Sequence, residues 1–188
     1  NTSVKNTIAS SDIRVLNALI DANGKTVASA SKTGIAHAGS ISDFSQKITL
    51  KSPQLWSIDS PYLYTLKTSI YKDNELIDEN SYKAGIRTIA FDPNTGFSLN
   101  GVNTTIKGVC LHHDAGVLGA AATKSVWRKR LETLKGLGVN GIRMSHNPQA
   151  PYLYELCDEM GFVVMDEAFD EWEYPKNKWI KGWNRGTP

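Results

Sequence analysis

The chain of 188 residues carries 21 lysines and arginines against 19 acidic residues, a formal net charge of +2. Its 40% hydrophobic and 9% aromatic residues are ordinary for a folded protein of one or two domains and exclude disordered and collagen-like classes. No stretch approaches the roughly 18 apolar residues of a membrane span, and no basic cluster suits a phosphate backbone. We therefore expect no membrane and no nucleic acid among the partners.

The two cysteines, Cys110 and Cys157, stand far apart in the sequence. We expect both to be free, buried thiols, because a bridge would require the fold to bring them together. The first residue is Asn1 rather than methionine, which indicates a processed product or a piece of a longer protein.

The first half of the chain has a period of two. Asn23-Gly24 predicts a type I′ hairpin turn, and Asp73-Asn74 predicts another turn. The predicted strands cover residues 13–17, 26–30, 44–50, 62–70, 75–81 and 84–91. Six or seven short strands without a helical period predict an antiparallel β-sandwich of immunoglobulin-like size over residues 1–91.

The second half, residues 92–188, has a different pattern. After turn residues at 92–96 and a short hairpin at Asn100-Gly101, strands are predicted at 105–110, 139–144 and 162–165. Helices are predicted between them, one from Thr123 to Gly138 and one from Pro151 to Gly161. This alternation predicts a parallel sheet, in either a doubly wound sheet or a (β/α)₈ barrel, and the apolar run at 162–165 suits a strand covered on both faces.

Polar residues gather where each of these three strands ends. They are His112, His113 and Asp114, then Arg143, Ser145, His146 and Asn147, and finally Asp166 and Glu167. Active sites lie at the carboxyl ends of parallel strands, so three coinciding clusters predict a site. Each cluster alone has a plainer explanation: the histidines could form a solvated loop, and Arg143 could pair structurally with Asp166. Arginine, histidine and carboxylate groups together suit a neutral, polyhydroxylated ligand.

Other chemistries lack their motifs. A zinc site, a nucleotide-binding glycine loop and a serine nucleophile all lack the required spacing. Asp166-Glu167 is a poor catalytic pair, because neighbours on a strand diverge whereas two glycosidase carboxyls flank one bond across about 5 to 9 Å. The aromatic and acidic segment at 170–174, with Trp179 and Trp183, is typical of sugar stacking or of a surface that another domain covers.

Two segments resemble the signature of the family-two glycoside hydrolases, the group of β-galactosidases, β-glucuronidases and β-mannosidases. They are residues 140–148, Asn-Gly-Ile-Arg-Met-Ser-His-Asn-Pro, and residues 156–168, which end in Asp-Glu-Ala. Residues 107–114 resemble the first barrel strand of that family and its loop. Leu55-Trp56-Ser57 and Gly85-Ile86-Arg87 resemble its immunoglobulin-like domain. The loop at 114–121 is most similar to enzymes known as β-galactosidases.

The resemblance implies a retaining glycosidase in which one glutamate protonates the leaving oxygen and a second forms a glycosyl-enzyme intermediate. Both glutamates of the family lie on later barrel strands, so the chain alone is expected to lack catalytic residues and activity. Its expected substrate-binding residues are His112, Arg143, His146 and Asp114. The alternatives are a stand-alone carbohydrate-binding module, a β-glucuronidase and a β-mannosidase.

The resemblance also bears on partners and cofactors. We expect a carbohydrate substrate, a homo-oligomer and no cofactor, although some members bind a divalent cation through acids after the third strand, where Glu171 and Glu173 stand. It suits an exported enzyme, periplasmic or secreted. The open barrel edge predicts that the isolated chain self-associates.

Overall fold

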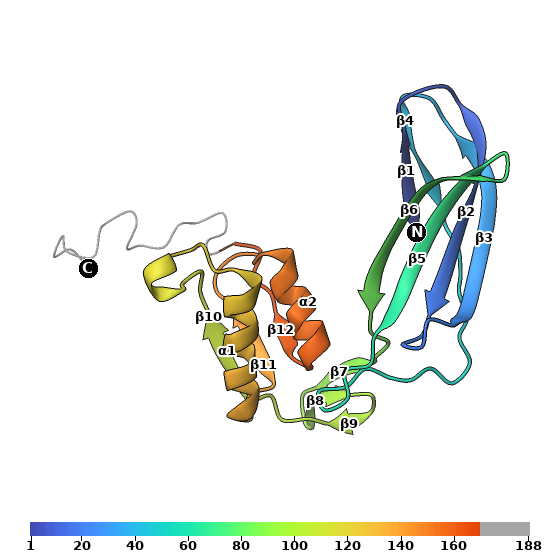
Figure 1. Cartoon of the computed structure of the whole chain (residues 1–188). Coiled ribbons are helices and arrows are strands. Elements are labelled where there is room, and N and C mark those ends of the chain that lie inside the picture. The colour runs from blue at the N-terminus through green and yellow to red at the C-terminus, as the bar shows by residue number, and fades with distance from the viewer. Residues whose placement is uncertain (170–188) are drawn as a thin grey trace. The chain divides into compact units, whose positions relative to one another are not determined.

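The computed structural model describes residues 1–169, which fall into two compact units, Asn1–Thr88 and a second unit that begins at Ile89 (Figure 1). No helix within the described residues is long and apolar enough to cross a membrane. The strands of the first unit are β1 (Thr2–Asn6), β2 (Ser11–Ile20), β3 (Thr26–Ala36), β4 (Ser40–Phe44), β5 (Tyr64–Lys72) and β6 (Glu75–Ala84).

The first unit is a sandwich of two antiparallel sheets. One sheet has four strands in the order β3-β2-β5-β6, and the other pairs β1 with β4. The buried cluster between them consists of Ile13, Val15, Ala36, Phe44 and Ile70. Ile13 and Val15 are alternate residues of β2, so the period of two places them on the same, inward face. The predicted sandwich class is confirmed.

Of the two turns predicted in the first unit, one follows the sequence closely and the other does not. Asp73 and Asn74, between β5 and β6, both have positive φ, as a type I′ turn requires. The hairpin at Asn23-Gly24 is confirmed, but its predicted type I′ turn is wrong, because of the two residues only Gly24 has positive φ. The loop there is longer, since the Asp21 carboxylate accepts hydrogen bonds from the backbone N–H groups of Asn23 and Lys25.

The strand predicted over residues 44–50 is wrong beyond its first residue, because β4 ends at Phe44. Residues 45–50 belong to no helix or strand. Gln46 instead ties this segment to the neighbouring sheet, with its side-chain Nε2 donating to the Val15 carbonyl at 3.0 Å.

The Leu55-Trp56-Ser57 and Gly85-Ile86-Arg87 motifs of the first unit contact each other. The Trp56 N–H donates to the Ile86 carbonyl at 2.8 Å, and the Arg87 guanidinium lies 4.6 Å from the centre of the Trp56 indole. Trp56 is only 1% exposed, and a Cβ on Gly85 would meet its side chain at 3.0 Å. The glycine therefore allows the indole to pack against the backbone.

The strand predicted over residues 84–91 is interrupted. β6 ends at Ala84, and β7 (Ile89–Asp92) pairs with β8 (Gly96–Leu99) in the second unit. β9 (Val102–Asn103) completes this small sheet, and the Asn100-Gly101 turn that joins it to β8 has positive φ at both residues, which confirms the predicted hairpin.

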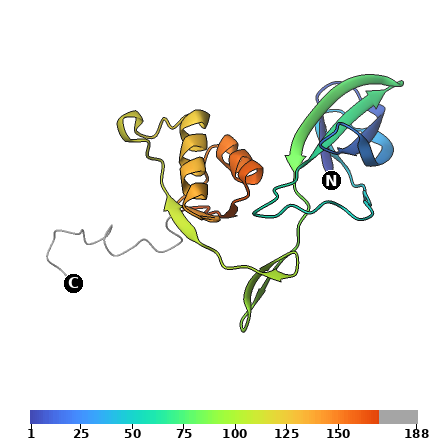
Figure 2. The ribbon, with the colours of Figure 1, turned by 60° about the horizontal axis from the view of Figure 1, so that its bottom comes forward.

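The remaining elements alternate as predicted. They are β10 (Gly108–Leu111), a short 3₁₀ helix (Gly116–Leu118), α1 (Lys124–Gly136), β11 (Gly141–Met144), α2 (Pro151–Met160) and β12 (Val163–Met165). The strands form a parallel sheet in the order β10-β11-β12, and both long helices lie on one face of it (Figure 2).

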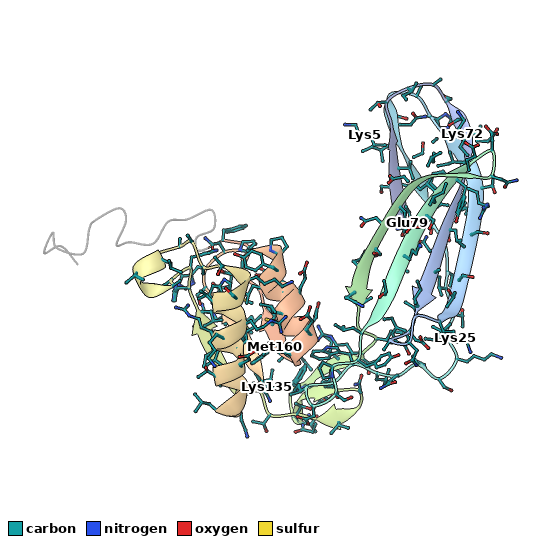
Figure 3. The ribbon with its side chains drawn as sticks, viewed as in Figure 1. Lys5, Lys25, Lys72, Glu79, Lys135 and Met160 are labelled. Carbon is teal, nitrogen blue, oxygen red and sulfur yellow. The ribbon has the colours of Figure 1, made fainter. Side chains whose placement is uncertain are left out.

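Local signals define both helices. Proline occupies the first turn of α2, and Gly161 ends that helix in the left-handed conformation at φ 76°. Lys135 in the last turn of α1 and Met160 at the end of α2 are labelled in Figure 3. The Lys135 ammonium donates to the Gly161 carbonyl at 3.1 Å and so supplies a partner at the end of α2.

The helix side of the sheet contains the core, and the opposite side is open. Trp127, Leu131, Ile142, Met144, Leu153, Leu156, Cys157 and Phe162 are buried between sheet and helices. Cys110, Arg143 and Met165 are register partners on the other side, and all three are exposed. Two predictions are therefore wrong among the described residues: Cys110 is exposed, although Cys157 is buried, and β12 is not covered on both faces.

Candidate functional site

The three polar clusters meet at one edge of the parallel sheet. Their residues follow β10, β11 and β12, whose carboxyl ends lie side by side because the strands are parallel and in register. The rings of His112 and His146 are 5.4 Å apart in an edge-to-face arrangement. A cavity of about 480 Å³ opens here and is lined by His112, His113, Ser145, His146, Asn147 and Phe169. The structure thus brings members of all three clusters, His112, His146 and Glu167, to this edge. Their role in substrate binding stays a prediction.

Glu167 links two of the predicted site residues. The Arg143 Nε donates to one of its carboxylate oxygens at 2.5 Å, and His146 Nδ1 lies 2.8 Å from the other. Because a carboxylate only accepts, His146 carries its proton on Nδ1 in this contact. The suggested ion pair between Arg143 and Asp166 is therefore wrong: the acidic partner is the next residue along the chain.

The charges of this cluster stabilise one another. Burial alone would raise the pKa of Glu167, but the hydrogen bonds from His146 and Arg143 outweigh it and lower the pKa. The same bond to Glu167, helped by the Cys110 thiol, raises the pKa of Arg143 above its ordinary value. Glu167 therefore stays ionised as the acceptor of two donors.

Asp166 belongs to a separate network on the helix side. The Tyr154 hydroxyl donates to the Asp166 carboxylate at 2.8 Å and accepts from the Gln149 N–H at 2.9 Å. The Gln149 side chain, 7% exposed, then reaches Nδ1 of His113 at 3.4 Å. Burial is the largest cause of the raised pKa of Tyr154. The hydrogen bond from the Gln149 N–H acts in the opposite direction, and the Asp166 carboxylate raises the pKa further. This network connects α2 with the loop after β10.

Asp114 serves its own loop. Its carboxylate accepts from the Gly116 N–H at 2.9 Å, and its backbone carbonyl accepts from the Arg130 guanidinium. Within residues 1–169 it is absent from the cavity lining, whereas His112 and His146 line the cavity and Arg143 adjoins it through Glu167.

Two buried polar atoms near the cavity have no hydrogen-bond partner within the described residues, the Ser145 hydroxyl and the Gln149 side-chain oxygen. Ser145 is 3% exposed and belongs to the cavity lining. Buried polar atoms are normally hydrogen-bonded, so the Ser145 hydroxyl in the cavity lining is suited to bond a water or a ligand hydroxyl.

Sequence reasoning placed Glu167 among the polar residues at the strand ends but missed its role as the partner of Arg143 and His146. The missed signal is the strand period. Met165 is the register partner of Arg143, and Glu167 stands two residues after Met165. The side chains of Arg143 and Glu167 therefore project to the same, open side of the sheet. Glu171, Glu173 and the aromatic segment through Trp183 lie outside the described residues. Within residues 1–169, no three His, Cys, Asp or Glu residues are grouped as metal ligands.

The comparisons with known proteins agree with this architecture. The pattern of "Glycosyl hydrolases family 2" matches residues 2–87, and that of its "TIM barrel domain" matches residues 93–174. The chain belongs to glycoside hydrolase family 2. Its sandwich and its parallel sheet are therefore the sandwich domain and the start of the TIM barrel of that family.

Among curated proteins, β-galactosidase BoGH2A of Bacteroides ovatus is 50% identical over 165 residues, which cover 88% of this chain and 19% of that protein. A family 2 structure from Bacteroides cellulosilyticus is 38% identical, with a TM-score of 0.82, over 85% of this chain and 22% of that one. The β-glucuronidase of Bacteroides uniformis is 29% identical with a TM-score of 0.82, over 88% and 20%. This chain thus spans about a fifth of the length of its relatives.

Proposed function

We propose that this chain forms the sandwich and first barrel strands of a retaining glycoside hydrolase that cleaves terminal β-linked sugars, with β-galactosides as its substrates. The observation that carries the proposal is the polar cavity at the carboxyl ends of β10 and β11, the edge at which TIM-barrel enzymes bind their substrates. The 50% identity to a β-galactosidase supports the choice of sugar.

The site residues divide into donors and acceptors that suit a sugar. Arg143 donates, the imidazoles of His112 and His146 donate or accept, and an unpartnered Ser145 hydroxyl does either. Such groups bind and orient hydroxyls, but they do not supply the acid and the nucleophile that a retaining mechanism needs. By resemblance, those two glutamates lie on later barrel strands, so the 188-residue chain alone is expected to be inactive.

The test is hydrolysis of p-nitrophenyl β-galactoside by the full-length protein that contains this chain, with the anomer first released identified by NMR. We expect turnover with retention of configuration. The 188-residue chain assayed beside it should release no p-nitrophenol above background. Turnover by the short chain would contradict the proposal and would make Asp166, Glu167 and Glu171 the candidate catalytic set.

A β-glucuronidase is the second candidate, because the Bacteroides uniformis β-glucuronidase shares this fold at a TM-score of 0.82. Assaying p-nitrophenyl β-glucuronide in parallel decides between the two sugars. A stand-alone sugar-binding sandwich is the remaining alternative. It requires glycan affinity that survives separate replacement of His112, Arg143 and His146 by alanine.

A further inference from the structure

Residues 45–50 continue the burial pattern of β4 although they belong to no strand. Gln46, Ile48 and Leu50 are half-buried, whereas the residues between them are exposed. A period of two is that of a strand with one face toward a core. The Gln46 Nε2 donates to the Val15 carbonyl of the neighbouring sheet at 3.0 Å, which fixes the inward direction. The segment thus has the side-chain pattern of a strand but no pairing partner within the residues that the structure describes.

β1 begins where this segment begins, and it runs in the opposite direction. The first residue of β1, Thr2, lies opposite Phe44, the last residue of β4. In an antiparallel pair, each step backward along one strand corresponds to one step forward along the other. A strand that continued β1 in the upstream direction would therefore place the residues before Asn1 opposite residues 46–50.

The inner face of the four-stranded sheet is open beside this segment. The Asn17 side chain donates to the Thr2 hydroxyl at 3.2 Å, so β1 begins partway along the sheet rather than at its end (Figure 1). A cavity of about 460 Å³ lies there. Its walls include Leu66, on the same face of β5 as the core residue Ile70, and Tyr82, the register partner of Leu66. Tyr82 is 57% exposed, although it stands on the face that a sandwich covers.

The register also fixes which upstream side chains would enter the cavity. Thr2 faces inward, opposite the buried Phe44, so the first, third and fifth residues before Asn1 would face inward as well. The first would meet Gln46, whose side-chain oxygen is buried and has no hydrogen-bond partner within the described residues. The third would meet Ile48, which lines the cavity. Apolar or β-branched side chains suit these positions, because burying them against an apolar wall is favourable.

We propose that this cavity is the docking site of a strand formed by the residues directly before Asn1 in the full-length protein. That strand extends β1, pairs antiparallel with residues 46–50 and covers the open part of the four-stranded sheet. The continuous register of β1 and β4 favours this occupant over a second copy of the chain, because the existing ladder then lengthens without a turn. The inference concerns the sandwich alone and does not depend on which sugar the enzyme cleaves.

The encoded sequence upstream of Asn1 gives the first check. Its first and third residues before Asn1 should be uncharged, with an apolar or β-branched residue at the third. A proline or a charged residue at either position would contradict the proposal, because the first breaks strand pairing and the second would be buried in the sandwich.

Hydrogen exchange at single-residue resolution then compares the full-length protein with the 188-residue chain. Every second amide of residues 45–50 should exchange at least about tenfold more slowly in the full-length protein, because strand pairing occupies alternate backbone N–H groups. Equal exchange in the two proteins would overturn the proposal. Uniform slowing of all these amides would overturn it too, since that indicates a cover that does not pair. Protection in the short chain that rises with concentration would instead make a second copy the occupant.

A cysteine pair in the full-length protein tests the register. Lys47 is exposed and stands opposite the second residue before Asn1 in the proposed pairing. Lys47→Cys together with a cysteine at that upstream position should form a disulfide under mild oxidation, because facing Cβ atoms of paired strands lie about 4.5–5.5 Å apart. The matched control moves the upstream cysteine one residue further back, where it faces the opposite side of the sheet.

Peptide mass spectrometry, which also distinguishes the native Cys110 and Cys157, should find the bond between the two introduced cysteines in the first variant and not in the control. No bond in either variant, equal bonding in both, or a bond between two molecules would overturn the proposed register and occupant.

Discussion

At the scale of single residues, the first unit depends on one close approach. Gly85 lies against the buried indole of Trp56, and the Arg87 guanidinium covers that same ring. Contact at 3.0 Å leaves no room for a methyl group unless the indole or the backbone moves. The Gly-Ile-Arg and Leu-Trp-Ser motifs are thus two sides of one packing contact.

We expect Gly85→Ala to destabilise the first unit by about 1–3 kcal/mol, the usual cost of adding a methyl group to a filled core. Urea unfolding followed by hydrogen exchange of peptides from residues 1–88 measures the effect on this unit alone. Ser29→Ala, at an exposed position of β3, is the control and should change stability by less than about 0.5 kcal/mol. Equal stability of the two variants would show that Trp56 yields without cost.

The two cysteines should differ sharply in reactivity. Burial, reinforced by the Asp158 carboxylate, raises the pKa of Cys157 to about 12, so its thiolate is scarce at neutral pH. Cys110 is exposed on the open side of the sheet. Iodoacetamide at pH 8 should therefore modify Cys110 in the native chain and leave Cys157 intact until urea is added. Peptide mass spectrometry measures this, and native labelling of Cys157 would contradict its burial.

At the scale of elements, helices could be predicted more completely than strands. The helix signals are local: Pro151 at the start and Gly161 at the end gave the bounds of α2 from the sequence. Strand pairing depends on distant partners. Residues 44–50 alternate as a strand does, but the chain leaves the sheet after Phe44, and no local pattern reports that.

The site shows the same division between local pattern and distant pairing. The strand ends and their polar residues could be predicted, because parallel strands bring their carboxyl ends to one edge. The choice of Glu167 rather than Asp166 as the partner of Arg143 depends on which side of the sheet each acid faces. That choice requires the register of β11 and β12, which the sequence alone did not supply.

The pairing of β5 with β6 carries a pH-dependent contact. Hydrogen bonds from Lys67 first, and then from Ser69, lower the pKa of Glu79, which is labelled on β6 in Figure 3. Because the folded pKa lies below the unfolded one, the contact stabilises the sandwich above the ordinary glutamate value near pH 4. That contribution is lost as the pH falls through the lowered folded value.

Glu79→Gln should therefore flatten the decline in the stability of the first unit between about pH 5 and pH 3. The effect should be small, because the ion pair is exposed to solvent. Urea midpoints at a series of pH values measure it, with Glu75→Gln, an exposed acid at the start of the same strand, as the control. Equal slopes in the two variants would mean that the Glu79 contact does not persist in solution.

At the scale of the whole molecule, the parallel sheet has three strands, whereas a complete TIM barrel has eight. Within residues 1–169, β10 and β12 each pair with a strand on one side only. Met165 on the open side is 65% exposed. Unpaired strand edges beside exposed apolar side chains are templates for association between copies.

The isolated 188-residue chain should therefore self-associate, and its mass by light scattering should rise with concentration. Met165→Lys should reduce that rise, because it places a charge beside the exposed edge of β12. Leu137→Lys is the matched control: Leu137 is 76% exposed but follows α1 on the covered side of the sheet, so the rise in mass should remain. A monodisperse monomer at high micromolar concentration would contradict the prediction and would mean that other residues of the chain protect both strand edges.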